Sequence, residues 1–129
     1  MKEVRNSIKS FRDLDAWKLG RIIRNQVYEI VKKLPDFEKY NLGSQLRRAA
    51  ISITANIAEG YGRFHYQENI QFLRISRGSV NEILDHLITC LDQGYIGQEI
   101  FNELETRINK EIQIIDGLIR SLRNKQKSK

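Results

Sequence analysis

The sequence predicts an all-α protein that folds as an antiparallel, up-down-up-down four-helix bundle. A chain of 129 residues is the length of one domain, and its single proline and eight glycines leave long stretches free to be helical. In four of these stretches apolar residues recur three or four positions apart, the period of a helix that packs one face against other helices. The connections between the stretches are short, so consecutive helices run antiparallel.

The segment 42–63, LGSQLRRAAISITANIAEGYGR, shows this period most clearly. One row of apolar or small residues runs along it, and a second row widens the stripe: Leu42, Leu46, Ala49, Ile53 and Ile57, then Ala50, Ile51, Ala55 and Ala58. A stripe this wide leaves few positions for water, so we expect this helix to be the most buried of the bundle. Asn41 marks the turn before it, and Gly60 is expected to end it as a left-handed C-cap.

The other three helices are expected over residues 13–34, 67–92 and 98–124. The first begins at Asp13 or Asp15, because an acidic residue favours a helix N-terminus, and it ends before Pro35. Residues after 124 are expected to be a frayed helix end or a disordered tail.

Four residues outside the apolar rows also have expected places. Phe37 and Tyr40, in the first connection, are expected to cover one end of the core. Gly78 lies inside the third helix, where a glycine costs about 1 kcal/mol relative to alanine. We therefore expect a neighbouring helix to approach closely there. Cys90 lies on an apolar helix face and is expected to be a buried core residue.

The net charge of +6 is unevenly distributed. Residues 1–12 carry +3 and residues 120–129 carry +5, whereas residues 13–119 carry −2. The chain is therefore divided into a flexible basic N-terminal arm over 1–12, a helical bundle over 13–122 and a basic C-terminal tail over 123–129. Both termini of an antiparallel four-helix bundle leave from the same end. Residues 1–12 and 120–129 thus form one strongly positive end, called here the basic pole.

Composition also indicates the compartment. The single cysteine cannot form an internal disulfide, which fits a reducing cytoplasm. The sequence has no apolar run of membrane-spanning length, and MKEVRNSIKS has no hydrophobic stretch that could serve as a secretory signal. We expect a cytoplasmic protein that does not bind membranes.

The residues do not form a recognisable catalytic or metal-binding pattern. The nearest to one is Glu82, Asp85 and His86, which could hold a metal weakly but fits an exposed polar face better. A di-iron bundle needs Glu-x-x-His on two helices, and a zinc site needs more cysteine or histidine than one Cys and two scattered His. The sequence therefore predicts a protein that is not an enzyme, with no metal and no cofactor.

Three stretches together resemble a known family: FRDLDAWKLG, QLRRAAISITANIAEGYGR and FLRISRGSVNEILDHL. They are similar to the small bacterial four helix bundle proteins, whose founding members are encoded in intervening sequences of the large-subunit ribosomal RNA gene. The accessory variability protein of diversity-generating retroelements is similar to them too. The resemblance runs from about Phe11 to about Leu122, with one departure: many members have a proline where this chain has Thr54.

The resemblance implies a cyclic homo-oligomer, with a homopentamer as the first expectation, and it implies no established activity. The helices expected over 13–34, 42–63 and 98–124 each have two apolar edges, more than one small bundle needs, which also favours burial between subunits. Five subunits would bring eight net tail charges each, or +40, to one rim.

Four residues of the central helix have two interpretations each. Asn56 and Glu59 are expected to be structural polar residues that tie this helix to its neighbours, and contact with nucleic acid is the alternative. Of Arg47 and Arg48, one is expected to pair with Glu82, and the other to face an adjacent subunit or a phosphate.

The function that the sequence favours is that of a non-catalytic, nucleic-acid-associated scaffold. Its basic side chains are expected to bind the RNA or DNA backbone: Lys2, Arg5, Lys9, Arg12, Arg47, Arg48, Arg120, Arg123, Lys125, Lys127 and Lys129. Two alternatives stay open. The basic ends could serve solubility alone, or the protein could be a protein–protein adaptor that assembles a partner enzyme such as a reverse transcriptase.

Overall fold

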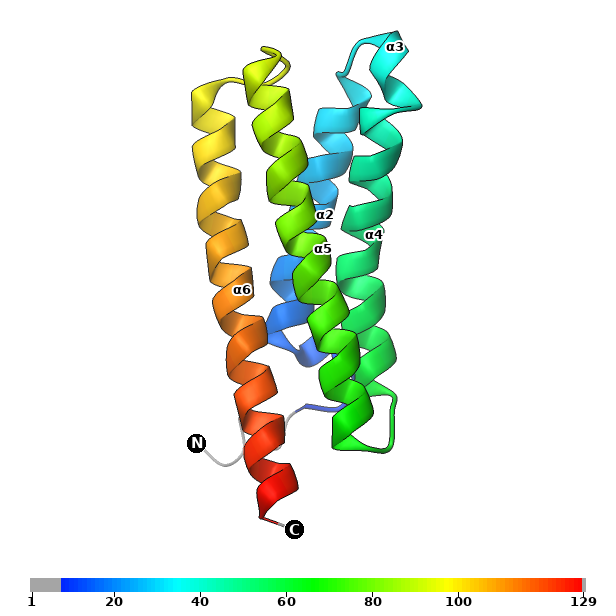
Figure 1. Cartoon of the computed structure of the whole chain (residues 1–129), viewed down its shortest axis with the longest axis vertical. Helices are drawn as coiled ribbons and strands as arrows, with labels where there is room; N and C mark the ends of the chain where they lie inside the picture. The colour runs from blue at the N-terminus through cyan, green and yellow to red at the C-terminus, as the bar shows by residue number, and fades with distance from the viewer. Residues whose placement is uncertain (1–7, 129) are drawn as a thin grey trace.

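The structure, a computed structural model, describes residues 8–128 and is helical along nearly all of this length (Figure 1). A single 3-10 turn, η1 (Phe11–Asp13), precedes the first long helix. The α-helices are α2 (Asp15–Lys32), α3 (Asp36–Lys39), α4 (Leu42–Tyr61), α5 (Tyr66–Asp92) and α6 (Gln98–Lys127). Residues 8–128 contain no β-strand, so the predicted all-α class is confirmed for them.

The four long helices form a closed ring of neighbours. Helix α2 packs against α4, α4 against α5, α5 against α6, and α6 against α2. Each helix runs opposite to the one before it, and the two ends of the described chain lie at the same end of the bundle (Figure 1). This is the predicted up-down-up-down order.

The predicted apolar rows supply most of the core, but Ile51 and Ala55 of the second row on α4 are exposed. Ile23, Leu46, Ile53, Leu87 and Ile108 are among the large side chains that are fully buried, and they come from all four long helices. Cys90 is buried with them, as predicted, and burial raises the pKa of its thiol to about 11. The thiol therefore stays protonated at neutral pH and serves as a small apolar residue.

Helix α4 continues without a break through Thr54, the position at which the resemblance implies a proline in many family members. Thr54 is buried, and its hydroxyl Oγ1 accepts a hydrogen bond of 3.2 Å from Arg24 Nη1 of α2. The same hydroxyl lies 3.4 Å from the carbonyl oxygen of Ile51, one turn earlier. Thr54 thus links the first two long helices.

The predicted role of Gly60 is wrong. It lies inside α4 and has no positive φ, and the residue that ends the helix is Gly62, in a right-handed conformation. Gly60 instead allows close packing, because a Cβ there would lie 2.7 Å from Asn69 Oδ1 and 3.0 Å from Phe72 Cβ. A left-handed glycine is found instead in the turn after α5, where Gly94 has a φ of 77°.

Two further expectations fail at exposed positions. Phe37 and Tyr40 do not cover the core, because their side chains are 76% and 90% exposed. The short helix α3 holds them away from it, fixed by the hydrogen bond from Tyr95 Oη to Glu38 (2.9 Å). Gly78 is not approached by a neighbouring helix, since no heavy atom would lie within 4 Å of a Cβ there.

Within the described residues, no helix is both long enough and apolar enough to cross a membrane. Helix α6 extends three residues beyond the predicted Asn124, through Lys127. Most of the predicted C-terminal tail is therefore helical, and its side chains have the fixed spacing of a helix.

Candidate nucleic-acid interface

The last turns of α6 carry the positive charge of the basic pole. Residues 117–128 include no aspartate or glutamate, so they have no carboxylate of their own with which to pair. Arg120, Arg123, Lys125 and Lys127 are all exposed, and none forms an ion pair within residues 8–128. Cations in the last turn of a helix also interact favourably with its dipole, which supports the helical conformation there.

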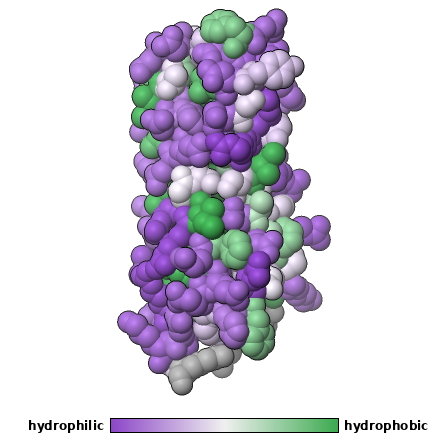
Figure 2. Space-filling view, turned by 45° about the vertical axis from the view of Figure 1, so that its right-hand side comes forward, coloured by the Kyte–Doolittle hydropathy of each residue, from purple (hydrophilic) through white to green (hydrophobic). Residues whose placement is uncertain are grey.

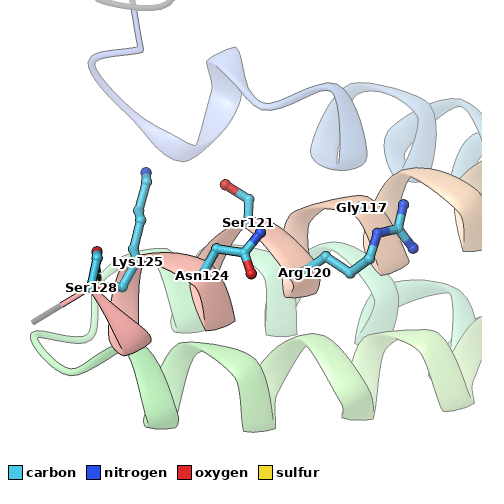
Figure 3. Close-up of a pocket in the computed structure, with 6 residues that line it drawn as sticks. All are labelled: Gly117, Arg120, Ser121, Asn124, Lys125 and Ser128. Carbon is cyan, nitrogen blue, oxygen red and sulfur yellow. Dashed lines mark hydrogen bonds between the residues drawn. The ribbon is translucent and has the colours of Figure 1, made fainter.

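Some of these side chains line a hollow on one strip of α6 (Figure 3). Its lining consists of residues three or four apart: Gly117, Arg120, Ser121, Asn124, Lys125 and Ser128. Ser121 and Lys125 extend toward the N-terminal segment that runs above the helix (Figure 3). Gly117 keeps this strip open, because the nearest atom to a Cβ there would be Arg120 Nη2 at 3.8 Å. The hollow combines two cations with hydroxyl and amide groups, the groups that proteins commonly offer to phosphate oxygens.

The N-terminal segment is ordered at this end by a capping box. Ser10 Oγ accepts a hydrogen bond from the backbone N–H of Arg12 (3.1 Å), and Asp13 Oδ2 accepts from those of Lys9 (2.8 Å) and Ser10 (3.2 Å). These backbone N–H groups lower the pKa of the Asp13 carboxyl, so it is ionised at neutral pH. The side chains of Lys9 and Arg12 remain exposed and without an ion pair in the described chain.

Arg47 and Arg48 lie away from the basic pole. They are near the start of α4, and α4 begins at the end of the bundle opposite the two termini (Figure 1). Arg48 pairs with Glu82 at 3.4 Å, as expected for one of the two, and also contacts Gln45. Arg47 donates to the backbone oxygen of Lys39 and to Ser44 Oγ, both at 3.3 Å, so it closes the C-terminus of α3.

Asn56 is part of a polar link between α4 and α5. Its Nδ2 donates to the oxygen of Ser52 (2.8 Å) and to Ser52 Oγ (2.9 Å). Ser79 of α5 donates to the same hydroxyl at 2.8 Å, and the nearby Ser76 hydroxyl donates to the oxygen of Ile53 at 2.8 Å. Hydrogen bonds with fixed partners across two helices set the register in which those helices pack.

Glu59 has a more exposed position. Its side chain is 54% exposed and pairs with Arg63 at 2.9 Å, four residues further along the chain. Arg63 in turn lies 3.8 Å from Glu68 of α5 and covers the ring of Phe72. Glu59 thus reaches the neighbouring helix only through Arg63.

The cluster of Glu82, Asp85 and His86 is held by protein contacts. Glu82 lies 3.1 Å from His86 Nε2 as well as 3.4 Å from Arg48. The part of the chain that the structure describes has no group of three His, Cys, Asp or Glu side chains suited to a metal ion. Lys2, Arg5 and Lys129, which are expected at the basic pole, lie outside the described residues.

One unusual residue was missed by the sequence reasoning. Glu111 of α6 is fully buried, and neither of its carboxylate oxygens has a hydrogen-bond partner. Burial raises the pKa of this carboxyl to about 8, so it is mainly protonated at neutral pH. The spacing in the sequence could have indicated its burial. Glu111 is three residues after Ile108 and four before Ile115, so it has the helical period of the apolar residues of α6.

The sequence matches a known protein family over residues 12–117, and this family is described as 23S rRNA-intervening sequence protein. The chain belongs to this family. No curated protein matches it. The predicted resemblance is confirmed, while the relation to the accessory variability protein of retroelements stays a prediction.

The family match ends where the hollow on α6 begins. It covers the four-helix core and stops at Gly117, so the cations from Arg120 onward lie beyond it. Membership of the 23S rRNA-intervening sequence protein family therefore accounts for the bundle. The match does not extend to the cationic end of α6.

Proposed function

We propose that this protein is a non-catalytic, oligomeric scaffold that binds the phosphate backbone of RNA or DNA through its basic pole. The observation that carries the proposal is the end of α6, where four exposed cations have no acidic partner among residues 8–128. Cations already neutralised by carboxylates gain little from a phosphate, whereas unpaired ones release counterions from the nucleic acid when they bind. The family description, which names an intervening sequence of 23S rRNA, supports RNA as the first ligand to test.

Binding of this kind is expected to depend strongly on salt and weakly on base sequence. The logarithm of the affinity for a single strand falls by about 0.7 for each phosphate contact per tenfold rise in salt. Exposed lysines and arginines without fixed acceptors give no geometry that distinguishes one base from another. Fluorescence anisotropy with labelled RNA, single-stranded DNA and duplex DNA at several salt concentrations measures both properties.

The test variant replaces Arg120, Arg123, Lys125 and Lys127 by glutamine. Substitution is preferable to deletion of residues 120–129, because Leu122 is buried and its loss would expose core. The control variant replaces four cations elsewhere, Lys32, Lys33, Arg74 and Lys110, so that the net charge changes equally. We expect the test variant to lose at least about tenfold in affinity at low salt and the control to lose much less. Equal losses would mean that net charge alone matters, and no binding by the unmodified protein would reject the proposal.

A protein–protein adaptor is the second candidate, and exposed apolar side chains favour it. Ile51 of α4 and Ile75 of α5 are 49% and 51% exposed, and Phe64 between these helices is more exposed still. Figure 2 shows the side of the bundle where α4 and α5 lie, with separate hydrophobic patches in a mostly hydrophilic surface. Such patches suit contact with another protein, which could be a second copy of this chain or a partner enzyme. The adaptor is the better proposal if no nucleic acid binds at low salt.

A further inference from the structure

A second cationic surface lies on α2 and shares no lining residue with the hollow on α6. It is a shallow hollow lined by Arg12, Trp17, Lys18, Arg21, Ile22 and Asn25, and is called here the α2 face. Positions 17, 21 and 25 are four apart, as are 18 and 22, so these side chains share one strip of the helix. Three of the lining side chains are cations and none is acidic.

The cations of the α2 face are not neutralised within the described chain. Arg12, Lys18 and Arg21 are exposed, and none of them forms an ion pair among residues 8–128. The pKa of the Asp13 carboxyl is lowered first by the backbone N–H groups of Lys9 and Ser10 and then by the charges of Lys18 and Arg12. Asp13 Oδ2 accepts from the backbone N–H groups of Lys9 and Ser10 and forms no ion pair with Arg12 or Lys18. The three cations of the surface outnumber this one carboxylate, so the α2 face stays positive.

An aromatic ring lies in the middle of these cations. Trp17 is half-buried, and the ring of Phe11 meets it edge to face with centroids 5.4 Å apart. The guanidinium carbon of Arg21 lies 5.7 Å from the centroid of the Trp17 ring. Both contacts restrict the indole of Trp17. A planar group such as a nucleobase can therefore stack on Trp17 or Arg21 with little further loss of side-chain conformational entropy.

We propose that the α2 face binds single-stranded nucleic acid, with phosphates at Arg12 and Lys18 and a base stacked at Trp17 and Arg21. This inference rests on the proposed function and specifies it, because it selects single strands over duplexes. In a duplex the bases are stacked on one another and offer no free face, so a duplex meets only the positive charge. In a single strand each base has an exposed face for aromatic and guanidinium groups.

Trp17 is the only tryptophan in the chain, so its fluorescence reports directly on this surface. The unmodified protein is titrated with a single-stranded oligouridylate and, separately, with an RNA duplex that carries the same number of phosphates. Stacking on Trp17 is expected to quench its fluorescence in the first titration and to leave it nearly unchanged in the second. Anisotropy of a label on each nucleic acid measures binding independently of Trp17.

Arg21→Lys separates stacking from charge, because it keeps the positive charge and removes the planar guanidinium. We expect it to weaken single-strand binding about five- to tenfold and to change duplex binding less than about twofold. Lys18→Gln is expected to weaken both. Lys33→Gln, an exposed cation at the C-cap of the same helix and outside the α2 face, serves as the control and should change neither by more than about twofold.

The outcomes separate this inference from the proposed function. If the nucleic acids bind by anisotropy but Trp17 fluorescence and the Arg21→Lys variant show no effect, the cations at the end of α6 act without the α2 face and the inference is overturned. If Trp17 fluorescence changes with protein concentration and not with oligouridylate, the α2 face is a contact between copies of the chain, which also overturns it. If no nucleic acid binds at low salt, the proposed function itself fails.

Discussion

The carboxyl group of Glu111 occupies the space that a side chain at Gly20 would need. A Cβ placed on Gly20 of α2 would lie 2.9 Å from Glu111 Oε2 and 3.0 Å from Ile53 Cγ2. Only a residue without a side chain lets α2 approach α6 at this point while a glutamate is buried between them. The pair thus explains why a glycine lies on the buried face of α2 and how a carboxyl fits in the core.

Stability should fall as the pH rises, because of Glu111. Its carboxyl has a usual pKa of 4.5 in the unfolded chain and about 8 in the folded one. Between these values the folded protein holds one more proton than the unfolded chain, so the free energy of unfolding decreases with rising pH, by at most about 1.4 kcal/mol per pH unit. This stability is fully present below pH 4.5 and is lost as the pH approaches 8.

The measurement is urea unfolding of the unmodified protein and of Glu111→Gln at several pH values between 5 and 9. The glutamine cannot ionise, so the variant should lack the part of the slope that comes from residue 111. Identical pH dependence in the two proteins would contradict a raised pKa for Glu111.

Two glycine-to-alanine substitutions should change stability in opposite directions. Gly60→Ala places a Cβ 2.7 Å from Asn69 Oδ1 and 3.1 Å from the backbone oxygen of Asn69, so it should destabilise the bundle by about 1–3 kcal/mol. Gly78→Ala adds a Cβ in open space inside α5 and should stabilise it by about 0.5–1 kcal/mol. Thermal melts followed by circular dichroism compare the two. A destabilising Gly78→Ala would indicate a contact at that position, such as one with another subunit.

The two polar residues of α4 should differ in their effect on stability. Asn56→Ala removes both bonds to Ser52 and should lower the free energy of unfolding by about 1 kcal/mol. Glu59→Ala removes an exposed pair between residues four apart and should cost about 0.5 kcal/mol or less. Denaturant unfolding of both variants checks this order. A larger loss for Glu59→Ala, together with a changed molecular mass, would place that residue at a subunit contact.

The protein should be an oligomer, and the exposed isoleucines of α4 and α5 should contribute to its interface. Sedimentation equilibrium at micromolar concentration is expected to give a mass well above the 15.2 kDa of one chain. Ile51→Glu and Ile75→Glu put a charge into this contact and should shift the protein toward the monomer. Ile100→Glu, at an isoleucine of similar exposure on α6, tests whether the second apolar edge expected on that helix belongs to the same interface. A single 15.2 kDa species for the unmodified protein would rule out the oligomer under these conditions.

The apolar period in the sequence determined which segments are helices and which of their faces are buried. Burial of an apolar face is favourable wherever the helix packs, so rows such as Leu46, Ala49 and Ile53 predict the core without knowledge of the neighbours. The sequence also indicates that the cations near the C-terminus are unpaired, because residues 117–128 contain no aspartate or glutamate to neutralise them.

The tertiary structure alone decided the contacts that involve two helices. The sequence indicates neither that Gly20 makes room for Glu111 nor that Gly60 rather than Gly78 is closely packed, because each depends on which atoms of another helix lie opposite. The separation of Arg47 and Arg48 from the basic pole follows from chain direction, which places the start of α4 opposite the termini (Figure 1). The meeting of Arg12 with Trp17 and Arg21 likewise depends on how η1 joins α2. Periodicity along one chain states which face of a helix is buried, whereas the partner of each side chain depends on the relative position of two elements in space.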